Sequence, residues 1–445
     1  MQPKKSLLRL TWPIYVELSF FVLLGLADTL MLSQYSDLAV AAVGNANRIM
    51  FLFIVILNVV SIGVGVVVSQ YVGANNVTEA KSAVRAGYLG TFFIGAFLSV
   101  VIAFSGRLIL RAVGADVLII DDAWLYLRIV SLGLVFMSMT QAAGQSFKSF
   151  GEPKTMMTIV GIGNGVNIIG NAVLIFGLGP FPELGVMGAA LSTLFSKFFS
   201  LIISLMVMYR RHGVHPFIFR LRPIRKHAKK IFHIGTPGAI EQFIYQSAQV
   251  VLLSYMNAIG TLALTTQIYV FNLMTPVLIF SLAVGQGNAV MVGWHIGARE
   301  DDLVYERSLQ TMRKGVGIVV AVATLVYLLS PWLLGLLSDN PYVLNTGQNV
   351  LLIVIFLEIG RYSNLVFIQA LRATGIVVFP VVIAFISMWL IMLPLAYYLA
   401  MVLSFGLIGI FLAVSTDEIG RGLMVYIRWR QKPWLRKERL IEVNS

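Results

Sequence analysis

The chain has 445 residues, of which 58% are hydrophobic and 12% are charged, a charged fraction about half that of ordinary soluble domains. So few charges cannot shield so much apolar surface from water, so the composition excludes an ordinary soluble globular protein and predicts an integral membrane protein. The absence of cysteine excludes a disulfide framework and thiol chemistry.

Long apolar runs, separated by charge clusters and by Gly and Pro, predict an all-α fold with twelve membrane-spanning helices. The first six are expected at 7–34, 40–72, 83–106, 118–146, 154–178 and 185–209. The second six are expected at 229–257, 262–297, 308–330, 343–372, 376–401 and 405–428. The first run carries charged residues and lacks a small-residue cleavage site, so we interpret it as a helix and not as a signal peptide.

The first expected helix carries an acid in the apolar stretch Leu-Gly-Leu-Ala-Asp-Thr-Leu-Met-Leu, at Asp28. No Lys or Arg lies within eight residues of it on either side. Ionisable groups inside a membrane are costly and tend to be functional. A carboxyl group in such surroundings can bind a proton reversibly, so Asp28 is the leading candidate for ion coupling.

The fifth expected helix carries three asparagines, Asn164, Asn167 and Asn171, at spacings of three and four residues. This spacing places all three on one helix face. Amides inside a membrane need hydrogen-bond partners, so we expect this face to point to the interior of its lobe, within reach of Asp28. Simple packing between helices is the alternative interpretation.

The tenth expected helix carries Glu358 and Arg361, whose i, i+3 spacing favours a local ion pair. His212 and His215 stand between helices 6 and 7, and two histidines without cysteine do not predict a metal site. The chain has no glycine-rich phosphate loop, nucleophile motif or metal-ligand cluster. The sequence therefore predicts no enzyme, no ATP-driven motor, no metal and no cofactor.

The sequence repeats itself at an offset of 224 residues, where Pro13 and Glu17 match Pro237 and Glu241. Because each half has six helices, the halves should be related by a pseudo-two-fold axis along the membrane normal. Asp28 breaks the repeat, whereas the duplicated acids suit a shared structural role, such as satisfying backbone groups near the prolines. The predicted domains are an N-terminal lobe 1–209, a basic linker 210–228, a C-terminal lobe 229–428 and a basic tail 429–445.

Most of the 33 Lys and Arg side chains fall on alternate connections, and the opposite connections hold only Arg107 and Arg111. The positive-inside rule therefore predicts a plasma-membrane protein with both termini in the cytoplasm. The net charge of +13 is thus a topology signal and does not indicate nucleic-acid binding. The basic linker and tail are expected to contact anionic lipid headgroups.

These features together resemble the multidrug and toxic compound extrusion (MATE) family. The resemblance covers nearly the whole chain and rests on the stretches Ala27-Asp28-Thr29, Gly151-Glu152-Pro153-Lys154, Asn167 to Gly177, and Gly185-Val186-Met187-Gly188-Ala189-Ala190. It looks closest to the DinF-like branch. This resemblance implies a V-shaped pair of lobes and drug/proton antiport with the proton site in the N-terminal lobe.

The resemblance also implies roles for single residues of the N-terminal lobe. Asp28 matches the family's helix-1 carboxylate, and Tyr126 matches its helix-4 tyrosine. Asn167 and Thr193 match its helix-5 asparagine and helix-6 threonine. Some members carry a second acid where this chain has Asn171, which leaves Asp28 as the main titrating group.

The predicted function is secondary active export of cationic amphipathic molecules by proton-coupled antiport, by a monomer whose two lobes alternate access. Charge selectivity should come from Asp28, because no basic side chain lies near it in sequence. The expected substrate-binding residues are Asp28, Met31, Asn164, Tyr245, Gln246, Gln267 and Asn272.

Three alternatives remain open. Sodium-coupled relatives carry acids in helices 7 and 10; the matching helix-7 position is Tyr245, but Glu358 keeps sodium coupling possible. A lipid-linked precursor flippase of the same superfamily should line its cavity with cations, of which helices 1, 5, 7 and 8 offer few. A channel or scaffold would not need two fused lobes.

Overall fold

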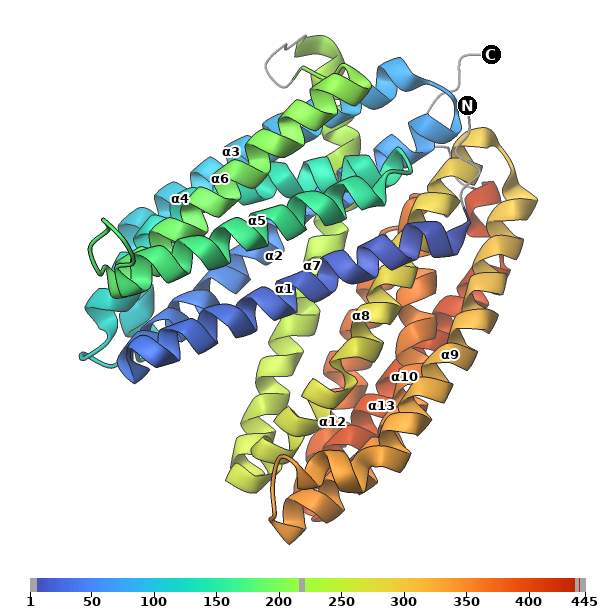
Figure 1. Ribbon diagram of the computed structural model, residues 1–445. Coiled ribbons are helices and arrows are strands. Elements are labelled where there is room, and N and C mark those ends of the chain that lie inside the picture. The colour runs from blue at the N-terminus through green and yellow to red at the C-terminus, as the bar shows by residue number, and fades with distance from the viewer. Residues whose placement is uncertain (1–5, 216–220, 437–439, 441–445) are drawn as a thin grey trace. The chain divides into compact units, whose positions relative to one another are not determined.

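The computed structural model describes residues 6–215, 221–436 and 440, and in these ranges the chain forms twelve long helices and no strand (Figure 1). The first six are α1 (Leu7–Tyr35), α2 (Asp37–Gly73), α3 (Val77–Ala112), α4 (Ile120–Ser149), α5 (Pro153–Phe176) and α6 (Gly185–His212). The next four are α7 (Leu221–Ile259), α8 (Thr261–Ala298), α9 (Asp301–Gly335) and α10 (Pro341–Ala373). The predicted all-α class and the twelve helices are confirmed.

The eleventh helix is continuous but irregular. It consists of α11 (Val378–Phe385), the π-helical turn η1 (Ile386–Met392), α12 (Leu393–Tyr397) and the π-helical turn η2 (Tyr398–Val402). The twelfth is α13 (Gly406–Arg430), followed by a short 3₁₀ turn, η3 (Pro433–Arg436). Wider π turns shift side-chain directions along a helix and often occur at functional positions.

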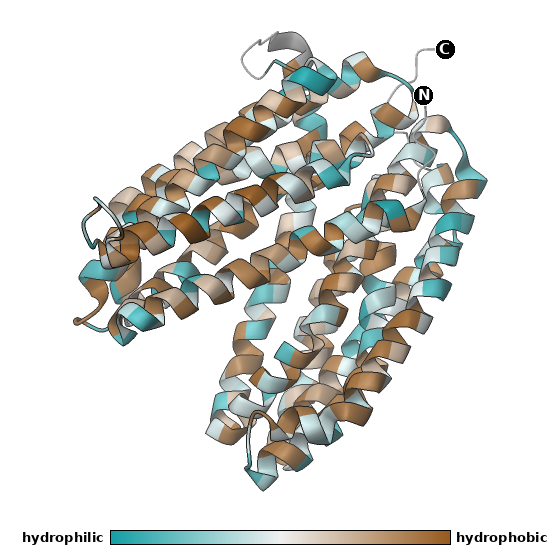
Figure 2. Cartoon of the chain, viewed as in Figure 1, coloured by the Kyte–Doolittle hydropathy of each residue, from teal (hydrophilic) through white to brown (hydrophobic). Residues whose placement is uncertain are grey.

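Ten of the helices in the described ranges are long and apolar enough to cross a membrane. The other two are α7, which carries several glutamines, and α13, which carries Asp417, Glu418 and Arg421 in its apolar part. Figure 2 shows hydrophobic residues along most of the helix lengths and hydrophilic residues at many helix ends. Polar groups within the α7 and α13 spans need internal partners.

The predicted helix ends are wrong by five or more residues in three helices. α3 spans Val77–Ala112 instead of 83–106, α7 begins at Leu221 instead of residue 229, and α9 spans Asp301–Gly335 instead of 308–330. All three helices extend beyond their apolar runs into polar sequence. At the start of α3, the side chain of Asn76 accepts a hydrogen bond from the backbone of Glu79, which stabilises the extra turns.

The chain divides into two compact units, and the first contains Trp12–Ala239. Within it, α4 packs against α2, α3, α5 and α6 and so forms the centre of the unit. The start of α7 belongs to this unit and lies against α2. A side chain at Gly63 would come within 2.2 Å of the Ile231 carbonyl oxygen, so this crossing brings the two backbones into direct contact.

The second unit contains Ser6–Thr11 and the chain from Ile240 onward. Its central helix is α10, which packs against α8, α9 and α13. An apolar cluster that includes Tyr362 on α10 and Met388 on the eleventh helix fills the space between these elements. The central helices α4 and α10 hold matching places in the two repeats.

Candidate functional site

Asp28 on α1 is half-buried and accepts a hydrogen bond from Asn171 on α5. The amide nitrogen of Asn171 lies 2.6 Å from Asp28 Oδ1. A second contact between these helices is made by Asn164, whose amide donates to the Phe20 carbonyl oxygen at 2.8 Å. Two polar side chains of α5 thus contact α1.

The hydrogen bonds continue from Asp28 across the unit. The side-chain amides of Asn171 and Asn167 lie 3.3 Å apart, and the Asn167 amide lies 3.3 Å from the hydroxyl of Thr193 on α6. The buried Tyr126 hydroxyl on α4 is hydrogen-bonded to Thr193 and to Asn47 on α2. The structure therefore brings all five predicted coupling residues, Asp28, Tyr126, Asn167, Asn171 and Thr193, into one network.

The Asn167 amide satisfies its polar neighbours in one orientation. Its nitrogen then donates to Asp28 Oδ1 at 3.0 Å, and its oxygen accepts from the Thr193 hydroxyl at 3.3 Å. Asp28 Oδ1 therefore accepts hydrogen bonds from two α5 amides, those of Asn171 and Asn167.

A lysine that the sequence analysis did not connect with Asp28 lies in the same part of the unit. The ammonium nitrogen of Lys197 on α6 stands 5.9 Å from the centre of the Phe21 ring on α1, the helix that carries Asp28. The absence of Lys and Arg near Asp28 in sequence therefore does not exclude basic residues from other helices of the unit. The lysine is distant in sequence, and its i, i+4 spacing from Thr193 was the available signal.

The duplicated acids occupy equivalent ion pairs, one in each unit. Glu17 lies 2.9 Å from Lys148, and Glu241 lies 2.6 Å from Arg372. These basic residues also match at the 224-residue offset. The structure gives each carboxylate a basic side chain from the unit's central helix as its partner, which differs from the expected partners among backbone groups near the prolines.

Glu241→Gln is expected to lower the free energy of unfolding by about 2 kcal/mol, because Arg372 loses its charged partner. Ion coupling should stay intact, because Glu241 is not part of the hydrogen-bond network around Asp28. Thermal unfolding and gradient-driven transport would measure the two effects. Glu306→Gln, at an exposed position on α9, is the matched control. Loss of ion coupling in Glu241→Gln, with a normal melting temperature, would contradict this assignment.

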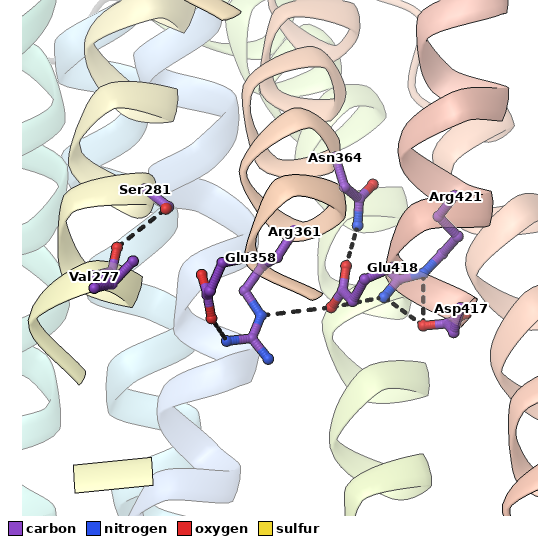
Figure 3. Close-up of polar contacts among 8 residues, drawn as sticks. All are labelled: Val277, Ser281, Glu358, Arg361, Asn364, Asp417, Glu418 and Arg421. Carbon is purple, nitrogen blue, oxygen red and sulfur yellow. Dashed lines mark hydrogen bonds and ion pairs between the residues drawn. The ribbon is translucent and has the colours of Figure 1, made fainter. Parts of the chain in front are cut away.

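The second unit buries a charged network between α10 and α13 (Figure 3). Arg361 pairs with Glu358 on its own helix and lies 3.7 Å from Glu418. Arg421 contacts Glu418 at 3.0 Å and Asp417 at 2.7 Å. The predicted pair Glu358–Arg361 is thus part of a larger set of three acids and two arginines.

Neutral side chains complete this network. Asn364 donates to Glu418 at 3.0 Å, and Ser387 in the π-helical turn η1 donates to Asp417. The α13 charges were not predicted, although Asp-Glu-x-x-Arg at 417–421 has the spacing of intrahelical ion pairs. Because these charges are closely paired with one another, we interpret the network as stabilising the packing of α10 against α13.

The remaining expected substrate residues are spread over both units. Met31 packs at the edge of the first unit's apolar cluster, and Tyr245 packs against that of the second. On α7 and α8, Gln246 and Gln267 are half-buried and Asn272 is exposed. Their grouping around one substrate stays a prediction.

Comparisons with known proteins all point to the same family. A family model described as MatE matches residues 13–173 and 237–398, and the two matches begin 224 residues apart, the offset of the internal repeat. The chain is 38% identical to the Uncharacterized transporter YisQ of Bacillus subtilis, over 97% of this chain and 95% of that protein. It is 26% identical to the Probable multidrug resistance protein NorM of Thermotoga maritima, over 99% and 96%.

A more distant relative and a solved structure add to this picture. The FAD transporter of Shewanella oneidensis is 25% identical over 95% of this chain and 93% of its own length. The crystal structure of a MATE protein in the bent conformation matches with a TM-score of 0.88 at 18% identity, over 97% of this chain and 95% of that one. The structural match establishes the fold.

Proposed function

Because the chain belongs to the MATE family, whose members are membrane transporters and not enzymes, we propose that it exports cationic amphipathic compounds in exchange for protons. The observation that carries this proposal is the network around Asp28. There, an acid in a membrane-spanning helix accepts hydrogen bonds from two amides of the neighbouring helix α5.

In the proposed cycle, ionised Asp28 accepts hydrogen bonds from the amides of Asn171 and Asn167, and its charge favours a bound cation. A proton entering from the opposite side of the membrane binds an Asp28 carboxyl oxygen and removes that charge. Substrate and proton then exclude each other, which is the requirement for antiport.

Transport into proteoliposomes with imposed gradients tests this proposal. A proton gradient alone should drive counterflow of a labelled lipophilic cation, and a sodium gradient alone should not. Coupling to sodium is the alternative, because acids such as Glu358 are buried in the second unit, although Arg361 neutralises that carboxylate. Transport driven by sodium at equal pH on both sides would refute proton coupling.

Binding of a rhodamine-like or phosphonium cation is expected to weaken as the pH falls, because the bound proton removes the attracting charge. Phe, Tyr and Met side chains are expected to surround the bound cation. Fluorescence polarisation of purified protein at several pH values would measure the affinity. Asp28→Asn should bind equally at all pH values, and a wild-type affinity that does not change with pH would exclude the mechanism.

An anionic substrate is a second candidate, favoured by Lys197, whose ammonium group stands over the Phe21 ring of α1, and by the relative named FAD transporter. Lipid-linked anions handled by a flippase belong to the same charge class. Competition of the labelled cation with flavin nucleotides and with pyrophosphate-linked lipids separates these substrates. Stronger competition by the anions than by unlabelled cation would replace the first candidate.

A further inference from the structure

Asn164 on α5 holds α1 through the backbone of that helix and not through a side chain. The Asn164 amide nitrogen donates to the Phe20 carbonyl oxygen at 2.8 Å. Phe20 lies inside the continuous helix α1, where the same oxygen also accepts the backbone amide four residues later. The bond from Asn164 is therefore an additional contact between two helices, and it involves no titratable group.

The Phe20 ring packs against α5 one turn before Asn164. A Cβ atom at Gly161 would lie 3.1 Å from Phe20 Cε2, which is closer than an ordinary side-chain contact. The absence of a side chain at Gly161 thus lets the ring approach α5 closely. The ring and the carbonyl oxygen together make Phe20 the residue of α1 that fits opposite Asn164.

The contacts of α5 with Phe20 and with Asp28 fix the register of α1. Asn164 and Asn171 are seven residues apart, or about 10.5 Å along α5, and Phe20 and Asp28 are eight residues apart, or about 12 Å along α1. Because these lengths are similar, both contacts form at once on one face of α1. A slip of α1 by one residue would move Asp28 by about 1.5 Å and turn it by about 100° away from Asn171.

The middle of α1 has few other contacts that could fix this register. No side chain of residues 18–31 is buried. In this stretch Ser19 and Thr29 donate to carbonyl oxygens of their own helix, and just before it Glu17 pairs with Lys148 on α4. Within the part of the chain that the structure describes, the α5 asparagines therefore supply the hydrogen bonds between this stretch and its neighbours.

We propose that Asn164 is a positioning residue that keeps Asp28 in register with Asn171, in place of the substrate contact expected from the sequence. This inference rests on the proposed function. Asn171 makes a charge-assisted hydrogen bond with ionised Asp28, and that bond weakens when a proton neutralises the carboxylate. The bond between Asn164 and Phe20 is unaffected, so it holds α1 during the protonated phase and returns Asp28 to the same amide.

The first test compares transport and binding in Asn164→Leu, which has a similar size but no donor. The maximal rate of proton-driven exchange should fall by up to about tenfold, because one hydrogen bond shifts an equilibrium by that much. Cation affinity at alkaline pH should stay at the wild-type value, because ionised Asp28 then keeps its own bond with Asn171. Asn164→Gln retains an amide donor and should recover much of the rate. Asn45→Leu is the matched control, because that amide donates to the Ala41 carbonyl oxygen of its own helix at 2.9 Å.

The second test measures the position of α1 directly. Because the chain has no cysteine, spin labels at Leu26→Cys on α1 and Ile169→Cys on α5, both exposed positions, report the distance between these helices. Electron paramagnetic resonance should give a narrow distance distribution in Asn164→Leu and in Asp28→Asn, since each keeps one strong contact. The double variant Asp28→Asn/Asn164→Leu lacks both the charge and the anchor, so its distribution should broaden.

The outcomes separate this inference from the proposed function. A narrow distribution in the double variant, or weaker cation binding by Asn164→Leu at alkaline pH, would overturn the positioning role and leave Asp28 as the coupling acid. Full proton-driven transport by Asp28→Asn would overturn the proposed function and this inference with it. If Asn164→Leu does not fold, Gly161→Ala displaces the Phe20 ring and should also slow exchange. Its control is Gly165→Ala on the same helix, where an added Cβ meets no atom within 4 Å.

Discussion

Asp28→Asn is expected to reduce proton-driven transport to the level of empty vesicles while the protein still folds. The amide has nearly the shape of the protonated acid and can keep the contact with Asn171, so the network retains its geometry. It cannot release or bind a proton, so the exchange step is lost. The apparent melting temperature should not fall, because the substitution removes a partly desolvated charge. Transport by vesicles under an imposed pH gradient gives the measurement.

Asp37→Asn is the matched control for this experiment. Asp37 lies at an exposed position in the first turn of α2, outside the network, so the same replacement of aspartate by asparagine can be made there. It should transport at the wild-type rate. Full proton-driven transport by Asp28→Asn would move the coupling site elsewhere, and the buried acids of the second unit would then be the first to test.

The helices could be predicted because each span carries an apolar run whose length matches a membrane. The ends were harder, since α3 and α7 continue into polar sequence where local capping and packing decide the boundary. Gly63, for example, permits α2 to meet the early turns of α7 at Ile231. Hydropathy does not record that contact, so the first turns of α7 were assigned to the linker.

The candidate site was only partly predictable for a related physical reason. The asparagine face of α5 follows from helical spacing, and the family resemblance supplied Tyr126 and Thr193. Lys197 was missed because neighbours in sequence do not reveal which helices pack together. An ionisable group in a span is a signal in itself, and Lys197 carried that signal without an evident partner on its own helix.

The buried charges of α13 were missed because they are separated in sequence from their partners on α10. Asp417, Glu418 and Arg421 lie near the end of the chain, where basic residues also belong to the predicted tail. The structure places them against Glu358 and Arg361. Burial in the second unit removes these charged side chains from water, and this desolvation is costly unless each charge has a close partner of opposite sign.

Arg421→Met is therefore expected to be among the most damaging single substitutions in the second unit. The guanidinium group contacts Asp417 through two nitrogens, at 2.7 and 3.0 Å, and Glu418 at 3.0 Å. Its removal leaves two buried carboxylates, of which Glu418 keeps Arg361 at 3.7 Å and Asp417 keeps only the Ser387 hydroxyl as a side-chain partner among the described residues. Breaking a buried pair in this way costs about 3–5 kcal/mol. Thermal unfolding of the purified protein, followed by circular dichroism, would detect the loss.

The double variant Arg421→Met/Asp417→Asn tests whether unpaired charge is the cause. Asp417→Asn removes one of the two buried carboxylates that lost Arg421 as their partner, and its amide can still form a hydrogen bond with Ser387. Much of the lost stability should therefore return. Arg430→Met, at an exposed position on the same helix, should have little effect. If the double variant were as unstable as Arg421→Met alone, packing of the long arginine stem would be the dominant contribution, and the charge network would be secondary.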